Sequence, residues 1–167
     1  MRLTDDKILF AKVREGAVIP TKRTEDAGYD IFCCFNGGMV IPPHTTKLIP
    51  TGVAVAMSDN WCFILKERSS TSKFSIDIMS SVIDSGYRGE IFVSWHNNGD
   101  TPILLCDDPE TFKIYLKEDF LIYDKKKAIV QGLFVEVPKL NIQEVTYEEL
   151  LQVESVRGTN CLGSTNL

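Results

Sequence analysis

The sequence predicts a single all-β domain, a β-sandwich or jelly-roll barrel, on three observations. Its apolar segments are short, rich in β-branched and aromatic residues, and separated by Gly, Pro, Asn and Asp. One segment alone has a helical pattern, at 146–153. The chain has 167 residues, which suits one domain, and no repeat or linker divides it. Many short strands with frequent turns are typical of closed or double-sheet β architectures.

The strand predictions follow from composition and from side-chain alternation. In "TGVAVAM", the larger Val53, Val55 and Met57 alternate with Ala54 and Ala56, which is the period of two expected of a strand. In chain order, the predicted strands are "KILFAKV" (7–13), "YDIFCCF" (29–35), "TGVAVAM" (51–57), "WCFILK" (61–66), "EIFVSWH" (90–96), "PILLC" (102–106), "FKIYL" (112–116), "FLIY" (120–123) and "AIVQGLFVEV" (128–137).

The C-terminal part of the chain has a different character. "TYEELLQV" (146–153) is predicted to be helical, because Thr146 can cap the helix and Glu149 stands three residues later. The tail that follows, "RGTNCLGSTNL" (157–167), has no buried periodicity and begins with Arg157. Such a tail is either a frayed terminus or an arm that orders over a ligand.

Charge and composition exclude several classes of protein. The net charge of −5 disfavours a duplex-DNA binder, and the short basic run "DKKKA" (124–128) is typical of a solvated turn. No apolar run approaches the ~20 residues that cross a bilayer, and the N-terminus has no secretory apolar region. We expect a soluble, cytoplasmic protein. The cysteines form no CxxC pair, so we expect reduced thiols rather than disulfides or a zinc site: Cys33, Cys34, Cys62, Cys106 and Cys161.

A candidate phosphate-binding turn follows the predicted strand at 61–66. In "ERSSTSK" (67–73), Arg68 offers a planar set of donors, and the hydroxyls of Ser69 and Ser70 add more. The same three residues are also typical of an ordinary polar turn. The segment therefore carries weight only together with other motifs.

A second motif, "VIDSGYRGE" (82–90), brings an acid and an aromatic ring close together. Asp84 follows two apolar residues, so it is either a general base at the edge of the core or a turn-capping residue. Tyr87 stands on a turn with Gly86 and Gly89, where a ring can pack on a sugar and leave no room for an extra hydroxyl. Asp30, just inside a predicted strand, is interpreted as a lone acid that caps or pairs.

Taken in order, five segments resemble the five motifs of the trimeric dUTPase family: "AGYDI", "RSS", "VIDSGYRGE", "VQ" and "RG…GST". The resemblance spans about residues 24–166. It implies a jelly-roll (β-clip) homotrimer that hydrolyses dUTP to dUMP and pyrophosphate, with each active site assembled from all three subunits. The implied organisation is a barrel over 1–156, with an inserted β-hairpin at about 101–123, and a C-terminal arm over 157–167 that closes the site.

The resemblance also implies roles for individual residues. Asp84 corresponds to the base that activates a water, Tyr87 to the ring on deoxyribose, and Asp30 to the acid that holds Mg²⁺ through water. The main chain at Val82 and Ile83 corresponds to the part that reads the uracil edge. The implied phosphate contacts are Arg68, Ser69, Ser70 and Gln131, with Arg157, Gly163, Ser164 and Thr165 from the arm. All of these would face one cleft.

Some positions depart from the family pattern and leave alternatives open. Ile78 replaces an Asn of the uracil pocket, and Cys161, Leu162 and Asn166 alter the arm. One alternative is a dCTP deaminase-like enzyme of the same fold, although Ser94 stands where its catalytic Glu would lie. Another is a nucleotide-binding regulatory protein that acts through a protein partner on the 101–123 insertion. No membrane or duplex nucleic acid is expected as a partner.

Overall fold

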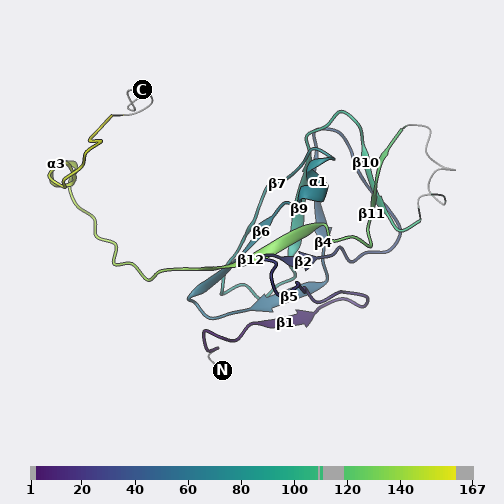
Figure 1. The fold of residues 1–167 in the computed structure, drawn as a ribbon, viewed down its shortest axis with the longest axis horizontal. Coiled ribbons are helices and arrows are strands. Elements are labelled where there is room, and N and C mark those ends of the chain that lie inside the picture. Colours follow the sequence, from purple (N-terminus) through teal and green to yellow (C-terminus); the bar gives the residue numbers. More distant parts are fainter. Residues whose placement is uncertain (1–2, 109, 111–118, 161–167) are drawn as a thin grey trace.

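The structure, a computed structural model, describes residues 3–108, 110 and 119–160. A body of strands is joined to a C-terminal extension that leads away from it (Figure 1). The strands are β1 (Leu9–Lys12), β2 (Tyr29–Ile31), β3 (Met39–Ile41), β4 (Thr46–Pro50), β5 (Val53–Ala56), β6 (Trp61–Lys66), β7 (Ile76–Ile78), β8 (Val82–Ile83), β9 (Phe92–Asn97), β10 (Ile103–Cys106), β11 (Leu121–Asp124) and β12 (Val130–Glu136). The helices are α1 (Ser69–Ser72) and α3 (Tyr147–Leu151). The predicted all-β class is confirmed.

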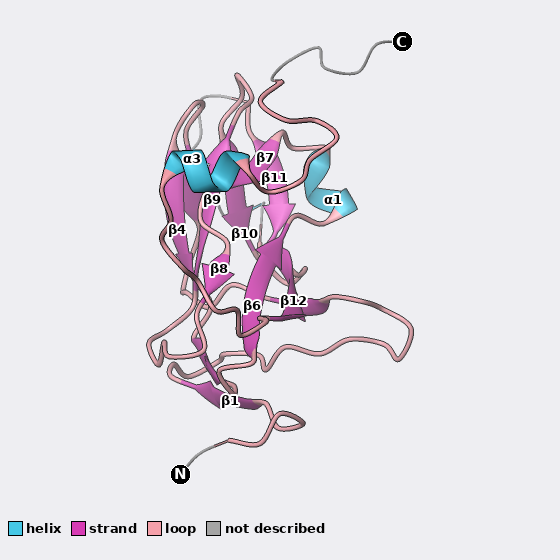
Figure 2. Ribbon diagram, turned by 90° about the vertical axis from the view of Figure 1, so that its left-hand side faces the viewer, coloured by secondary structure: helices cyan, strands magenta, loops and turns pink. Residues whose placement is uncertain are grey.

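The strands form four small sheets, with the orders β1-β5, β11-β10-β3, β2-β12-β6-β8 and β4-β9-β7. Almost all neighbouring strands are antiparallel, and the central pair β6-β12 places Lys66 opposite Gln131. In the same sheet, β2 places Asp30 opposite Gln131 from the other side. This register places Asp30, Lys66 and Gln131, which are far apart in the sequence, side by side on three neighbouring strands. Figure 2 shows the strands filling the body, with α1 beside β7.

The core lies between these sheets and is rich in aromatic residues. The rings of Phe63 and Phe134 stack with centroids 4.5 Å apart, and Trp95 meets Tyr123 edge to face at 5.2 Å. Phe63 and Trp95 are fully buried. Burying an aromatic or branched side chain of this size contributes about 1.5–3 kcal/mol, so the core holds the sheets in a fixed relation.

Several elements were not expected from the sequence. Strands β3, β4, β7 and β8 are short, or they expose most of their residues, so they carry no clear alternation. The predicted strand at 29–35 ends at Ile31. The polar turn after β6 continues into α1, because Thr71 Oγ1 accepts the Arg68 N–H at 3.1 Å and donates to the Arg68 carbonyl at 2.7 Å. These side-chain bonds replace missing backbone partners at the start of the helix.

The inserted segment at about 101–123 was predicted to add a β-hairpin, and this stays a prediction because one of its three predicted strands is not described. Of the other two, β10 and β11 pair in parallel, with Ile103 opposite Leu121. Parallel neighbours need a crossover, so these two strands are not the arms of a hairpin. Strand β10 also pairs antiparallel with β3, which attaches the segment to the body. The predicted strand at 112–116 lies outside the described residues.

The C-terminal extension contains the predicted helix. Thr146 caps α3, since its hydroxyl accepts the Glu149 N–H at 3.2 Å and the Glu149 carboxylate accepts the Thr146 N–H at 2.8 Å. The capping prediction is therefore confirmed. Apolar side chains of the extension, including Leu140 and Ile142, are exposed, and α3 stands apart from the body (Figure 1). The helices of the described part are too short or too polar to cross a lipid bilayer.

Candidate active site

The predicted phosphate-binding turn lies where β6 ends and α1 begins. Strand β6 brings the chain to Arg68, and the bonds to Thr71 turn it into α1, so that Ser69 and Ser70 are exposed. The Arg68 side chain is fixed by three partners. Its Nε lies 3.1 Å from Asp30 Oδ1, and its Nη1 donates to the Ala128 carbonyl at 3.1 Å and to Ser70 Oγ at 3.4 Å.

Strand β12 adds Gln131 to the same place. Its Nε2 donates to the Glu67 carbonyl at 2.9 Å, which holds the amide beside the turn. Predicted residues Asp30, Arg68, Ser69, Ser70 and Gln131 all line one hollow of about 700 Å³. The structure therefore brings together the predicted phosphate contacts of the barrel and the predicted acid.

The hollow also contains cationic residues that the sequence reasoning missed. Lys22 and Arg23, from the segment before β2, line it together with Thr21, Asp26, Ala27 and Gly28. Arg23 is tied to the Asp26 carboxylate at 2.8 and 3.0 Å. The basic pair in "TKRT", directly before "AGYDI", was the available signal. Together with Arg68, these cations suit a polyanionic ligand despite the acidic net charge.

A second hollow, of about 270 Å³, lies at the end of β8. Strand β8 pairs with β6, placing Ile83 opposite Phe63, and then turns sharply because the Tyr87 N–H donates to the Asp84 carbonyl at 3.1 Å. The predicted residues Val82, Ile83, Asp84 and Tyr87 all line this hollow, with Leu48, Ser80, Glu90, Phe92 and Ser94. An acid, an aromatic ring and an apolar wall are thus combined.

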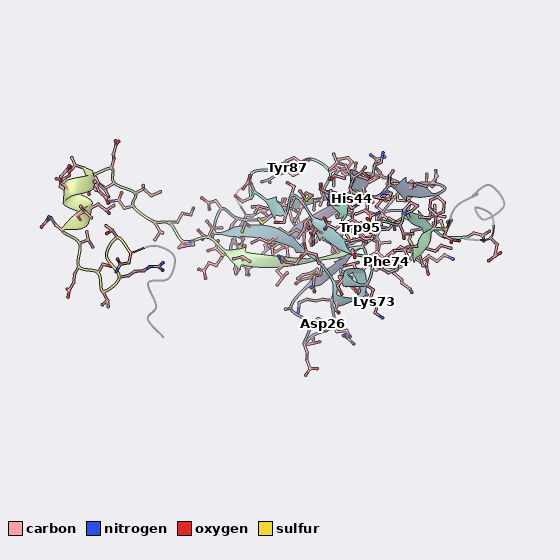
Figure 3. All side chains as sticks on the ribbon, turned by 90° about the horizontal axis from the view of Figure 1, so that it is seen from above. Asp26, His44, Lys73, Phe74, Tyr87 and Trp95 are labelled. Carbon is pink, nitrogen blue, oxygen red and sulfur yellow. The ribbon has the colours of Figure 1, made fainter. Side chains whose placement is uncertain are left out.

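Within one chain, the two hollows share no lining residue. Figure 3 shows Tyr87, from the second hollow, and Asp26, from the first, at opposite edges of the body. The expected cleft, with Asp84 and Tyr87 facing the arginines, is therefore not formed by a single chain. Sequence motifs say which residues act together but not whether one copy of the chain brings them together.

The predicted arm residues lie elsewhere. Arg157 follows α3 in the extension, and its Nε donates to the Asn160 carbonyl at 3.0 Å. Gly163, Ser164 and Thr165 lie outside the described residues. Neither hollow is lined by Arg157. The assignment of the arm to the site therefore stays a prediction.

Glu90 lines the second hollow and was not among the predicted residues. The hydrogen bond from Arg14 lowers the pKa of its carboxyl, and a backbone bond from Gly52 acts in the same direction against the opposing effect of burial. The cysteines are free in the described part, and burial raises the pKa of the Cys33 thiol to about 11. Cys33 is thus a poor nucleophile at neutral pH.

The first hollow offers oxygen donors but no cluster of metal ligands among its described residues. Among the described residues, no group of three or more His, Cys, Asp or Glu side chains is placed to hold a metal ion. The hollow offers the carboxylates of Asp26 and Asp30, three hydroxyls and the amide of Gln131. A hard cation that keeps most of its waters and binds mainly through a phosphate ligand, as Mg²⁺ does, fits such an oxygen set.

The fold and the two hollows define a β-barrel protein with a hollow lined by arginine, lysine and serine side chains and a separate hollow lined by an acid and an aromatic ring. A dUTPase family model matches residues 14–107. The deoxyuridine 5'-triphosphate nucleotidohydrolase of Nitrosospira multiformis is 36% identical over 170 residues, covering 99% of this chain and 98% of that protein. The chain belongs to the dUTPase family and is an enzyme of that family.

Solved structures show the same jelly-roll fold. The dUTPase of Staphylococcus bacteriophage 80alpha, solved with dUPNHPP, is 24% identical, covers 97% of this chain and 99% of its own, and has a TM-score of 0.74. A dUTPase from phage phi11 of S. aureus, described with a structural Mg(II) ion, is 21% identical, covers 86% of this chain and 99% of its own, and has a TM-score of 0.67. At these identities, the likeness establishes the fold.

Proposed function

We propose that the chain is a dUTP diphosphatase that hydrolyses dUTP to dUMP and pyrophosphate, which supplies dUMP and limits uracil incorporation into DNA. Family membership supports the reaction. The observation that carries the mechanism is the shared hollow of Asp84 and Tyr87, whose walls include Val82, Ile83 and Phe92. An apolar wall beside one exposed acid suits a nucleoside whose α-phosphate lies next to a base.

Asp84 and Tyr87 have different roles at the nucleoside end of the substrate. Asp84 takes a proton from a water molecule while the oxygen of that water attacks the α-phosphorus. The bond between the α-phosphorus and the oxygen that bridges to the β-phosphorus breaks, and pyrophosphate leaves. Tyr87 stacks on the sugar and excludes a 2'-hydroxyl. The main chain at Val82 and Ile83 reads the uracil edge, where Ile78 provides no side-chain hydrogen bond.

The turn after β6 binds the phosphates. Arg68, Ser69, Ser70 and Gln131 hold the triphosphate through charge-assisted and neutral hydrogen bonds, and the arm residues Arg157, Gly163, Ser164 and Thr165 close over its far end. Most of the rate then comes from aligning the water, phosphorus and leaving group rather than from covalent catalysis. Lys22 and Arg23 add positive charge to the lining of the first hollow.

Mg²⁺ is the proposed cofactor, with Asp30 as the protein group that holds it through water. When bound, it neutralises part of the charge of the triphosphate. The dUTPase of phage phi11 is described with a structural Mg(II) ion, which supports magnesium in the family. Asp30 also has a second task, because it orients Arg68 through their ion pair.

A homotrimer is the proposed assembly. It would allow the two hollows, which lie apart within one chain, to meet across the contact between two chains. In a ring of three copies, a heterologous interface can place the first hollow of one chain against the second hollow of its neighbour. The extension then carries residues 157–167, as an arm distinct from the barrel over 1–156, to a neighbouring copy. Its exposed apolar side chains suit such docking.

One assay tests the reaction. Pyrophosphate release is measured with dUTP, UTP, dTTP and dCTP, each with and without Mg²⁺. We expect turnover of dUTP that depends on Mg²⁺ and little turnover of the other nucleotides. Ammonia release from dCTP would favour the deaminase, although that enzyme lacks support here because Ser94 is nearly buried and has no carboxylate. Tight binding of dUTP without turnover would favour the regulatory alternative, whose contact surface at 101–123 stays a prediction.

A further inference from the structure

An ion pair between Arg14 and Glu90, neither of them a predicted site residue, holds the loop that carries Tyr87. Arg14 lies two residues after the end of β1. Its Nε donates to both carboxylate oxygens of Glu90, at 2.7 and 2.9 Å. The Glu90 side chain is 12% exposed and that of Arg14 is 47% exposed, so the pair is only partly screened by solvent. The two residues are 76 positions apart in the sequence.

Gly52 completes this anchor. Its N–H donates to Glu90 Oε1 at 2.8 Å, and its carbonyl accepts the Val13 N–H at 2.7 Å. Its φ of +69° lies in the left-handed region, and an added Cβ would meet Ala17 Cβ at 2.7 Å and Arg14 Cβ at 3.1 Å. A side chain at position 52 would therefore be strained and would push Arg14 away from the carboxylate.

The backbone of Glu90 in turn fixes the Tyr87 ring. The Tyr87 hydroxyl donates to the Glu90 carbonyl at 2.8 Å. The ring passes directly over Gly89, where an added Cβ would lie 2.4 Å from the hydroxyl oxygen. Tyr87 is thus attached to one residue, Glu90, whose side chain is attached to the body through Arg14 and Gly52. A shift of Glu90 moves the ring with it.

We infer that the Arg14–Glu90 ion pair positions the Tyr87 ring and thereby sets the preference of the site for a deoxyribonucleotide over a ribonucleotide. The inference rests on the proposed function, in which Tyr87 stacks on the sugar. Arg14 and Glu90 are positioning residues, because they act through Tyr87. A ring that excludes a single hydroxyl by contact must be held closely, since a small displacement already makes room for it.

The test compares kcat/KM for dUTP and for UTP in the full chain and in Arg14→Ala, Arg14→Lys, Glu90→Ala and Glu90→Gln. Arg14→Lys keeps a charge that can reach the carboxylate, and Glu90→Gln keeps an acceptor for Gly52. Asp100→Asn is the control, because Asp100 makes an exposed contact with His44 and neither residue lines a hollow. Crystal structures of the variants report the distance from the Tyr87 hydroxyl to the Glu90 carbonyl whether or not the enzyme turns over.

We expect Arg14→Ala and Glu90→Ala to lower the preference for dUTP over UTP about tenfold, which corresponds to about 1.4 kcal/mol. The loss should arise mainly from better use of UTP, and the Tyr87 hydroxyl should leave the Glu90 carbonyl. Arg14→Lys should restore most of the preference. If the alanine variants fail to fold, Glu90→Gln and Arg14→Lys are compared instead. Glu90→Gln should then lose more of the preference for dUTP over UTP than Arg14→Lys.

Two results would overturn the inference. One is an unchanged ratio of kcat/KM for dUTP and UTP in variants that fold. The other is a Tyr87 ring that stays on the Glu90 carbonyl after the ion pair is removed. A wild-type chain that hydrolyses neither nucleotide would instead contradict the proposed function, and the crystal structures would still decide whether Tyr87 follows the ion pair.

Discussion

The Asp30 carboxylate lies 3.1 Å from the Arg68 guanidinium, so the arginine expected to bind phosphate already has an anionic partner. The ion pair fixes the orientation of the Arg68 side chain. It also places a carboxylate inside the hollow that we propose binds the triphosphate. These two effects oppose each other for a bare triphosphate, because the acid repels it. When Mg²⁺ accompanies the nucleotide, the acid attracts the metal ion instead of only repelling phosphate, so both effects favour binding.

Replacing this acid should change the metal requirement. We expect Asp30→Asn to raise the Mg²⁺ concentration for half-maximal activity about tenfold, which is typical of groups that hold a metal through water. Binding of a non-hydrolysable dUTP analogue without Mg²⁺ should become tighter, because one negative charge is removed. Pyrophosphate release against Mg²⁺ and calorimetric titration measure the two effects. Asp26→Asn is the control, and an unchanged Mg²⁺ midpoint in Asp30→Asn would count against a metal role.

The base should be separable from binding. Asp84→Asn keeps the shape of the side chain but removes its ability to take a proton, so we expect kcat to fall about a thousandfold. The affinity for a non-hydrolysable dUTP analogue should change little. Asp77→Asn is a matched control, because Asp77 is exposed on β7 and lines neither hollow. A variant of Asp84 with near-normal kcat would exclude this acid as the base.

Mixing two inactive chains tests whether a site takes residues from two copies. Arg68→Ala removes the phosphate contact and Asp84→Asn removes the base, so each homotrimer should be nearly inactive. After co-refolding of equal amounts, about a quarter of the sites would combine an intact Arg68 with an intact Asp84 if neighbours contribute them. Activity should recover to a similar fraction of wild type. If both residues acted within one chain, every site would keep a defect and no recovery would appear.

Two glycines of one loop provide a matched pair for the ring. In Gly89→Ala, the added Cβ would lie 2.4 Å from the Tyr87 hydroxyl oxygen, so the ring must move. In Gly86→Ala, the added Cβ meets nothing within 4 Å. We expect Gly89→Ala to lose about tenfold in preference for dUTP over UTP, a loss of about 1.4 kcal/mol, while Gly86→Ala keeps it. Equal ratios of kcat/KM in the two variants would show that the ring position does not govern sugar selection.

The charge of Glu90 should stabilise the protein only above acidic pH. Its pKa in the folded protein is lowered by Arg14, with the Gly52 N–H contributing against the effect of burial. Such a group adds stability above its unfolded pKa of about 4.3, and this stability disappears as the pH falls through the lower folded value. Glu90→Gln should therefore lower Tm at neutral pH by about 3 °C.

Thermal unfolding of wild type and Glu90→Gln, followed by circular dichroism, measures this difference from neutral pH to acidic pH. The two Tm values should approach each other below the unfolded pKa and converge once the pH lies below the lowered folded pKa, where the wild-type carboxyl is also protonated. A difference that stays constant over this range would mean that the ion pair contributes no net charge interaction to stability.

Signals contained in short stretches of the sequence were sufficient for much of the fold. The alternation at 51–57 predicted β5, and the Thr146 and Glu149 pair predicted the start of α3, because both patterns are set by neighbours within a few residues. Residues that line a hollow from within one motif, such as Ser69 with Ser70, were also foreseen, because they share one turn. The lining residues Lys22, Arg23 and Glu90 were not. Segments whose signal is weak, such as β8 with two residues, were not.

Relations between distant segments depended on the tertiary structure. The parallel pairing of β10 with β11, the ion pair of Arg14 with Glu90, and the placement of Arg68 and Asp84 in different hollows leave no local pattern. Each depends on which sheet edges meet after the core has packed, and many distant pairings are compatible with the same alternation of side chains. Local propensity thus specifies the elements and the loop chemistry, whereas the packing of Phe63, Trp95 and their neighbours decides which loops come together.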